Sequence, residues 1–421
     1  MRQRRVMTAF AVGALVLSAC GGGATPAPST SASTPGASAP AASTAPSASA
    51  AAASPSANVP ASLGATEGAL NLVAWAGYVV GGTGGEQVQG YDWVTPFETA
   101  TGCKVTVKVG LDSANMVQLM KTGQYDGVSA SGDATLRLIA GGDVSAVNFN
   151  LIPNYKNVFD GLKNQSYNTV NGVGYGVPHG RGANVLMYDP TVVKTVPDSW
   201  SVVFDANSPY KGKVTAYNYA IYIADAALYL MKTKPELAIT NPYSLDETQL
   251  AAAVALLKVQ KTLVGKYWGT AQEEIDGFTN GDMAIGSAWL YQQNTINAAG
   301  GKQVASVTPK EGATGWSDTW MISSKAKHPN CMYAWMDYII SPKANADVTV
   351  YFGEAPVSAA ACAEAEKQSA GFCDQFHAAD ETYFKNIWYW NTPTKTCLDG
   401  RGDICTDFDA WTKAWTDVTG G

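Results

Sequence analysis

Short apolar runs alternate with stretches of helical spacing along residues 67 to 140. The run Lys104–Val109 alternates apolar and polar positions as a half-buried strand does, and Ala69–Ala74 is a short apolar run with one polar residue, Asn71. Strands that alternate with helices predict a mostly parallel sheet with helices on both faces. The predicted strands are Ala69–Ala74, Lys104–Val109 and Tyr125–Ala130, and the predicted helices are Tyr91–Ala100, Ala114–Lys121 and Asp133–Ala140.

The same rhythm continues to about residue 350, without an internal repeat. The further predicted strands are Gly174–His179, Ala183–Tyr188, Val214–Tyr217, Met283–Trp289 and Thr319–Ser323. The further predicted helices are Ala220–Met231, Thr248–Leu263, Asp276–Asn280, Asn330–Ile340 and Pro342–Val350. This order predicts an α/β fold of two discontinuous lobes, one from residues 67–180 and 318–360 and the other from 181–317 and 361–421. Two crossovers between lobes form a hinge, the usual device for closing on a ligand.

The first 66 residues have a different composition. A basic start, Met1–Arg5, precedes the apolar run Val6–Leu17 and the box Leu-Ser-Ala-Cys that ends at Cys20. This pattern predicts a secretory signal over residues 1–19 and matches the bacterial lipoprotein signal, in which the cysteine is lipidated; an ordinary signal with an incidental cysteine is the alternative. Residues 20–66 are almost wholly Ala, Ser, Pro, Thr and Gly, which predicts a disordered tether. We therefore expect an exported protein that is held on the outer face of the cytoplasmic membrane by its lipid alone.

The charge balance limits the partners. The formal net charge is −7, and it becomes −10 without the three arginines of the first five residues. An acidic body argues against nucleic acid and against an anionic membrane surface as partners, and it is compatible with a cationic ligand.

Cysteine usage fits export. The chain has seven cysteines, and six remain beyond Cys20. Six cysteines allow about fifteen pairings. Local spacing favours Cys362–Cys373 and Cys397–Cys405, which leaves Cys103 and Cys331 for each other. No pair has Cys-x-x-Cys spacing and the chain has three histidines, so a structural zinc site is not expected.

The stretch Pro309–Trp320 carries the most specific pattern of the chain. Trp316, Asp318 and Trp320 are spaced two apart, so in an extended chain they share one face. Indole rings beside a carboxylate suit an organic cation, through charge-assisted hydrogen bonds and cation–π attraction. The alternative is an edge-strand aspartate between two core tryptophans.

This stretch, with its Pro-Lys-Glu-Gly and Trp-x-Asp, resembles the polyamine-binding (spermidine/putrescine) branch of ABC-transporter substrate-binding proteins. The opening strand that ends in Trp-x-x-Tyr and the crossover Gly176-Val177-Pro178 resemble the same branch. The resemblance implies a periplasmic-binding-protein-like fold with a central cleft, a small-molecule amine as ligand, and a permease with its ATPase as partners. It implies a monomer without a cofactor or metal. The ligand-binding residues that it suggests are Trp75, Tyr78, Ser131, Asp133, Trp289, Trp316 and Asp318.

The sequence also departs from that branch. Where polyamine binders usually present acids in the second lobe, this chain has Tyr217, Tyr219 and Tyr222, with no carboxylate before Asp225. We therefore include Tyr219 and Tyr222 as an aromatic box, and Glu354 as a substitute acid beside Asp133 and Asp225. Three tyrosines in place of acids favour a compact amine or a methylated ammonium over a long polyamine. Arg181 would suit the carboxylate of a zwitterion, with a structural ion pair as its alternative.

A hydrolase and an iron-binding protein are the two alternative classes for this sequence. A hydrolase would need a nucleophile and a base, but the chain has no Gly-x-Ser-x-Gly elbow and few histidines for a triad. A glycosidase uses two carboxyl groups as its catalytic pair, and Glu273 and Glu274 are adjacent acids. Carboxylates on a helix surface are, however, usually exposed to solvent and have no catalytic role. An iron-binding protein of the same architecture would use tyrosine ligands, which would leave Trp316 and Asp318 idle. We therefore expect a binding protein and not an enzyme.

Overall fold

The structure is a computed structural model that describes residues 59–420. The predicted signal over 1–19, Cys20 and the tether as far as residue 58 lie outside the described residues. The described end of the tether has neither helix nor strand. Hydrogen bonds join it to the body at three points. The Asn148 side chain donates to the carbonyl of Pro60, the backbone N–H of Gly64 donates to Asn330, and the Thr66 hydroxyl donates to the carbonyl of Thr101. Among residues 59–420, no helix is both long enough and apolar enough to cross a membrane.

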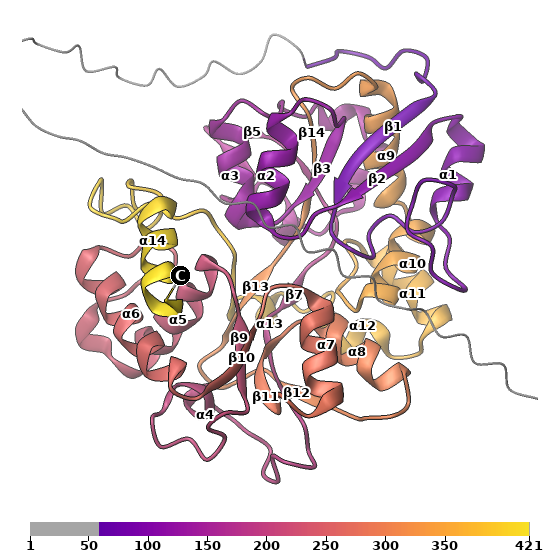
Figure 1. The fold of residues 1–421 in the computed structure, drawn as a ribbon. Coiled ribbons are helices and arrows are strands. Elements are labelled where there is room, and N and C mark those ends of the chain that lie inside the picture. The colour runs from indigo at the N-terminus through magenta and orange to yellow at the C-terminus, as the bar shows by residue number, and fades with distance from the viewer. Residues whose placement is uncertain (1–58, 421) are drawn as a thin grey trace, which may run out of the picture. The chain divides into compact units, whose positions relative to one another are not determined.

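The first of two five-stranded sheets is mostly parallel (Figure 1). Its strands in spatial order are β2 (Lys104–Val109), β1 (Ala69–Ala74), β3 (Gly127–Ala130), β14 (Thr319–Ile322) and β6 (Val177–Pro178). Only β14 runs against its neighbours, since it pairs antiparallel with both β3 and β6. Because β1, β2 and β3 are parallel, their carboxyl ends meet at one edge of the sheet.

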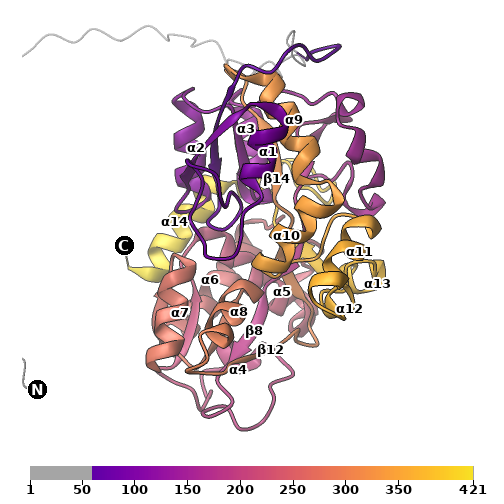
Figure 2. The ribbon, with the colours of Figure 1, turned by 90° about the vertical axis from the view of Figure 1, so that its right-hand side faces the viewer.

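Helices cover both faces of this first sheet. Helix α2 packs on β1 and β3, and α9 packs on β1 and β14 (Figure 2). The disulfide Cys103–Cys331 joins the residue before β2 to α9 and closes a separation of 228 residues. We call this body the first lobe. Its helices are α1 (Val94–Thr101), α2 (Ser113–Lys121), α3 (Gly132–Ala140), α9 (Pro329–Ile339) and α10 (Pro342–Phe352), and a short hairpin joins β4 (Thr169–Val170) to β5 (Val173–Gly174).

The second five-stranded sheet repeats the arrangement, with β8 as the strand that runs against its neighbours. Its strands in spatial order are β10 (Val264–Trp268), β9 (Val214–Tyr217), β11 (Ile285–Ala288), β8 (Val185–Tyr188) and β12 (Ala305–Val307). With its helices we call it the second lobe. The helices are α4 (Ser201–Phe204), α5 (Ile223–Thr233), α6 (Glu247–Lys261), α7 (Ala271–Asn280) and α8 (Leu290–Ala298).

A small three-stranded sheet contains strands from the segments through which the chain passes between the two larger sheets. Its order is β15 (Ile387–Tyr389), β13 (Ala313–Trp316) and β7 (Gly182–Ala183). The chain leaves the first sheet at β6 and enters β7 four residues later, and it returns from β13 to β14 across Ser317 and Asp318. Two connections therefore run between the larger sheets. The predicted two-lobed α/β fold is confirmed.

The C-terminal 60 residues are held by two local disulfides, Cys362–Cys373 and Cys397–Cys405. These are the two pairs that local spacing favoured, and Cys103–Cys331 is the pair that was left. The helix α14 packs on α6 of the second lobe, and α11 packs on α10 of the first. The helices of this region are α11 (Ala359–Gln368), α12 (Phe372–Gln375), α13 (Glu381–Phe384) and α14 (Phe408–Thr419), none of which we predicted.

Other predicted elements need correction at their ends. The predicted strand Gly174–His179 is divided between β5 and β6, which belong to different sheets. The predicted helix over Asp276–Asn280 is the end of α7, which begins five residues earlier at a Thr270 capping box. Helix α8 and strand β10 were missed. Strand β10 directly follows α6 with exposed positions at Gly265 and Lys266, so it lacks the apolar run of a central strand.

Candidate functional site

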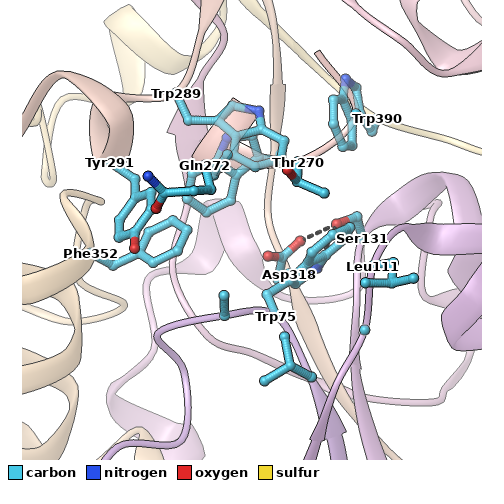
Figure 3. Close-up of a pocket in the computed structure, with 16 residues that line it drawn as sticks. Trp75, Leu111, Ser131, Thr270, Gln272, Trp289, Tyr291, Asp318, Phe352 and Trp390 are labelled. Atoms are coloured by element: carbon cyan, nitrogen blue, oxygen red, sulfur yellow. Dashed lines mark hydrogen bonds between the residues drawn. The ribbon is translucent and has the colours of Figure 1, made fainter. Parts of the chain in front are cut away.

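A cavity of about 190 Å³ is lined by residues that follow strands of all three sheets (Figure 3). From the first sheet come Trp75 after β1 and Ser131 after β3, and from the second come Thr270 after β10 and Trp289 after β11. Ligands of open α/β sheets bind beyond the carboxyl ends of strands, so the position is the expected one. The lining residues are Trp75, Ala76, Val109, Gly110, Leu111, Ser131, Gly269, Thr270, Ala271, Gln272, Trp289, Tyr291, Trp316, Asp318, Phe352 and Trp390.

Asp318 is the one charged side chain among these lining residues. It lies in the short connection between β13 and β14 and is 4% exposed. Its Oδ1 accepts a hydrogen bond from Ser131 Oγ at 2.5 Å, and its Oδ2 accepts one from Tyr78 Oη at 2.7 Å. A carboxylate has about four acceptor positions, so two hydrogen bonds fix its orientation and leave acceptor capacity for a ligand.

Ser131 occupies the N-cap position of α3, but its side chain makes no cap hydrogen bond. Its hydroxyl accepts from Trp75 Nε1 at 3.1 Å and donates to Asp318. A serine at an N-cap normally accepts from the helix backbone and stabilises the helix by about 1 kcal/mol. Here the hydroxyl serves the carboxylate instead, so an indole, a hydroxyl and a carboxylate form one hydrogen-bonded chain. We call Trp75, Ser131 and Asp318 the polar wall.

Burial sets the protonation of the polar wall. Removal from water raises the pKa of Asp318 to about 6, although the hydrogen bonds from Ser131 and Tyr78 act in the opposite direction. A buried ammonium beside Asp318 would favour the ionised form and lower that pKa again. At pH 7 Asp318 is therefore mainly ionised and gives the cavity lining one negative charge.

Aromatic rings face the polar wall. Trp289 lies edge-on to Trp75 with the ring centroids 6.2 Å apart, and it also contacts Trp268 at 5.0 Å and Trp390 at 6.4 Å. Tyr291 stacks on Phe352 at 5.0 Å. Figure 3 shows this pair at one end of the cavity and Trp390 at the other. We call Trp289, Tyr291 and Trp390 the aromatic wall.

Five of the predicted ligand-binding residues line the cavity, namely Trp75, Ser131, Trp289, Trp316 and Asp318. The ring of Trp316 occupies the space that a side chain at Gly182 would need, with its Cζ2 2.5 Å from the position of a Cβ. Tyr78 lies directly behind the lining. It is fully buried and meets the ligand space only through its hydrogen bond to Asp318.

The three predicted substitute acids do not line the cavity. Asp133 is buried, and its Oδ1 accepts from Ser113 Oγ at 2.9 Å; burial raises the pKa of Asp133 to about 7. Glu354 is buried behind Tyr78, with its Oε2 3.5 Å from the Tyr78 hydroxyl. Asp225, the first acid after the three tyrosines, accepts from Thr314 Oγ1 at 2.9 Å and also lies outside the lining.

The predicted aromatic box is not formed around the cavity. Tyr219 Oη accepts from Arg137 at 3.4 Å, and Tyr222 is buried with its hydroxyl accepting from Gln260. Because β9 ends at Tyr217, the chain turns into a 3₁₀ helix over Ala220–Tyr222 and then into α5, so the alternation that would bring the tyrosines to one face stops. Their hydroxyls have different partners, which does not suit a shared iron ion.

Arg181 and Trp320 need similar corrections. Arg181 is 1% exposed and donates to the carbonyl of Ala378 and to Glu381, so the structural ion pair is the alternative that the structure supports. Trp320 does not share a face with Trp316 and Asp318. The chain changes sheets between β13 and β14, and Trp320 points into the core of the first lobe, where its Nε1 donates to His179 Nδ1 at 2.8 Å.

Sequence reasoning missed four large lining residues: Leu111, Tyr291, Phe352 and Trp390. Leu111 follows β2 and was accessible to the strand-end argument that selected Trp75. Phe352 ends α10, and Tyr291 begins α8, which we did not predict. Trp390 follows β15 in the region for which no elements were predicted.

Comparison with known proteins gives the same architecture. The putrescine/agmatine-binding protein of Pseudomonas aeruginosa is 24% identical over 286 residues, which cover 62% of this chain and 75% of that protein. The solved spermidine/putrescine substrate-binding protein PotD from Streptococcus pneumoniae has a TM-score of 0.63 at 18% identity, with 83% of this chain and 97% of that chain covered. A putative spermidine/putrescine transporter from Listeria monocytogenes has a TM-score of 0.66 at 16% identity, with coverages of 84% and 99%.

The family model described as bacterial extracellular solute-binding protein matches residues 92–372, about two thirds of the chain. This range contains α1 to α11 and most of the cavity lining. The prediction of an exported binding protein in place of an enzyme is thereby confirmed. On this match, together with the two-lobed fold, the chain belongs to the bacterial extracellular solute-binding proteins.

Proposed function

We propose that this protein is the substrate-binding component of an ABC importer for a small cationic amine. The observation that carries the proposal is the single charged group of the cavity, Asp318, held between two hydrogen-bond donors. An ammonium group takes the remaining acceptor positions of Asp318, and the aromatic wall supplies ring faces. Cation–π attraction adds about 0.5–2 kcal/mol when water is excluded.

The composition of the cavity also limits the ligand. A cavity of about 190 Å³ suits a small molecule, and its lining offers one carboxylate for one ammonium. A second ammonium buried without a partner would cost several kcal/mol. Since Arg181 is engaged with Glu381, the carboxylate of a zwitterion has no cationic partner in the lining. A compact amine is therefore favoured over both spermidine and a zwitterion.

The relatives support the amine class. Those with 24–25% identity to this chain carry names such as putrescine/agmatine-binding and putrescine/cadaverine-binding protein. A permease and its ATPase are the partners that this role requires. The connections over 179–181 and 317–318 serve as the hinge between the lobes, with the ligand bound where the polar and aromatic walls meet.

A lipid on Cys20 anchors the protein, and residues 20–66 hold the body near the membrane. The Leu-Ser-Ala-Cys box is the observation behind this part of the proposal. We expect the wild-type protein to partition with membranes and the Cys20→Ser variant to be released. Fractionation of cells that express each form measures this, and equal membrane association of the two would contradict it.

Calorimetric titration with a matched panel tests the ligand class. The panel consists of methylammonium, putrescine, spermidine, choline, γ-aminobutyrate and a neutral sugar. We expect a compact amine or quaternary ammonium to bind most tightly and the sugar not to bind. Tightest binding of spermidine or γ-aminobutyrate would show that the charge of the cavity has been misread. Binding of the sugar alone would overturn the proposed function.

A further inference from the structure

Behind the polar wall lies a second carboxyl group that the ligand does not touch. Glu354 follows α10 and is 0% exposed. Its carboxyl group occupies the space beside Gly180, where an added Cβ would lie 2.4 Å from Oε2. Glu354 is therefore built into the first lobe, and a side chain at position 180 would displace it.

The polar groups around Glu354 bring no positive charge. The Tyr78 hydroxyl lies between the two carboxyl groups, 2.7 Å from Asp318 Oδ2 and 3.5 Å from Glu354 Oε2. The hydroxyl has one proton to donate. Because the contact to Asp318 is the shorter one, Tyr78 donates to Asp318 and not to Glu354. A hydrogen bond between Tyr78 and Glu354 then needs a proton on Glu354.

The other neighbour of Glu354 is His179. Trp320 Nε1 donates to His179 Nδ1 at 2.8 Å, so the imidazole proton is on Nε2. That nitrogen lies 3.4 Å from Glu354 Oε1 without hydrogen-bond geometry. Burial lowers the pKa of His179 to about 3, so the ring is neutral. The guanidinium of Arg181, two residues after His179, donates to Glu381 and to the carbonyl of Ala378.

A buried carboxylate beside a second carboxylate, without a cation, is costly. We propose that Glu354 is a specificity-determining residue of the amine site, a protonated carboxyl that acts through Tyr78 so that Asp318 is the one negative charge offered to the ligand. Burial and the charge of Asp318 both raise the pKa of Glu354, in agreement with the geometry. The inference rests on the proposed function and explains why a site with two acids selects a single ammonium.

The first test needs no ligand. A raised pKa in the folded state means that folding takes up a proton, so the wild-type protein loses stability as the pH rises above the unfolded value of about 4.3. The amide of Glu354→Gln resembles the protonated acid but does not titrate, so the variant should not lose stability in this way. We expect the urea midpoint of Glu354→Gln to rise relative to wild type between pH 5 and pH 8. Glu247→Gln, on the exposed first turn of α6, should stay parallel to wild type.

The second test is the pH profile of methylammonium binding between pH 6 and pH 8, where aliphatic ammonium groups with pKa values of about 10.4 keep their charge. At pH 7 we expect Glu354→Gln to bind within about threefold of wild type. Across this pH range the ratio of the two affinities should stay constant, because the proposal makes Glu354 as neutral in wild type as the glutamine is in the variant. Loss of tenfold or more at pH 7 would identify Glu354 as a charged counter-ion and overturn the proposal.

The two tests separate this inference from the proposed function. If wild type binds no amine, the proposed function fails, and the urea midpoints still decide whether Glu354 is neutral. A difference in midpoint between wild type and Glu354→Gln that does not change with pH would overturn the inference even where methylammonium binds tightly.

Discussion

The two walls of the cavity are built at equivalent places and use different chemistry. In both lobes, lining residues directly follow parallel strands: Trp75 and Ser131 in the first, Gly269 and Trp289 in the second. The polar wall contains the charge and the hydrogen bonds of the site. The aromatic wall offers rings, and Trp289 is held by further rings behind it, Trp268 and Tyr217.

This difference divides the work of recognition. Hydrogen bonds to a charged group are directional and are lost entirely when one partner is removed. Ring faces attract a cation more weakly and tolerate several positions of it. We therefore expect the polar wall to decide whether a ligand binds and the aromatic wall to adjust how tightly it binds. The predictions below test this division from the largest effect to the smallest, with a compact amine identified by the panel as ligand.

Replacement of Asp318 by Asn should have the largest effect. It keeps the size of the side chain and removes the charge, so amine binding should weaken by about 2–5 kcal/mol, the range for one partner of a buried charge pair. Calorimetry with Asp160→Asn as control measures this, because Asp160 is an aspartate of the same lobe with a side chain that is 99% exposed. Undiminished binding by Asp318→Asn would remove the basis of the proposed function.

Much of the fold was predictable, for identifiable reasons. Strands β1 and β2 were predicted to the residue, because largely apolar or alternating runs are bounded there by Gly68 and by the turn at Gly102. The pairing of Cys362 with Cys373 followed from their spacing. The prediction stopped at residues 361–421, where α12 and α13 have four residues each and are too short for a periodic pattern. Helix α14 was overlooked although its buried residues Phe408, Trp411, Trp415 and Val418 have helical spacing.

The site was predictable where a residue ends a regular strand. Trp75, Ser131 and Trp289 could be found in this way. Trp320 could not, because its interpretation assumed one extended strand, whereas the chain changes sheets at Ser317 and Asp318. Tyr222 was misplaced for a related reason, since a 3₁₀ helix follows β9. Changes of sheet and of helix type depend on long-range packing that a local pattern does not contain.

Removal of a donor to Asp318 should have the second largest effect. Tyr78→Phe removes the hydroxyl that contacts Oδ2 and keeps the ring that packs on Phe352 at 4.8 Å. Hydrogen bonds to charged groups contribute about 1.5–3 kcal/mol, so we expect amine affinity to weaken by that order. Since the hydrogen bond from Tyr78 lowers the pKa of Asp318, the variant should also need a higher pH for full binding. A variant that bound as wild type does at every pH would show that Tyr78 serves packing alone.

The pH dependence of the wild-type protein gives the third prediction. The pKa of Asp318 in the ligand-free protein is about 6, which is above its ordinary value. Folding therefore favours the protonated form of Asp318. Its contribution to the free energy of unfolding is present at low pH and is lost as the pH rises through about 6. A cation needs the ionised form, so amine affinity should change in the opposite direction and fall about tenfold from pH 7 to pH 5. Titration at three pH values measures this, and an affinity that is flat or rises toward pH 5 would contradict it.

The smallest effect should come from the aromatic wall. Trp289→Leu keeps an apolar side chain and removes the ring that faces Trp75, so the loss should be about 0.5–2 kcal/mol, the range of a cation–π contact. Trp268→Leu is the matched control. That indole supports Trp289 from behind at 5.0 Å and lies outside the lining, so its loss should lower stability more than it changes binding. Calorimetry and urea denaturation of both variants separate the two contributions. If Trp289→Leu weakened binding as much as Asp318→Asn does, the aromatic wall would decide whether a ligand binds at all, and the division of work between the two walls would be wrong.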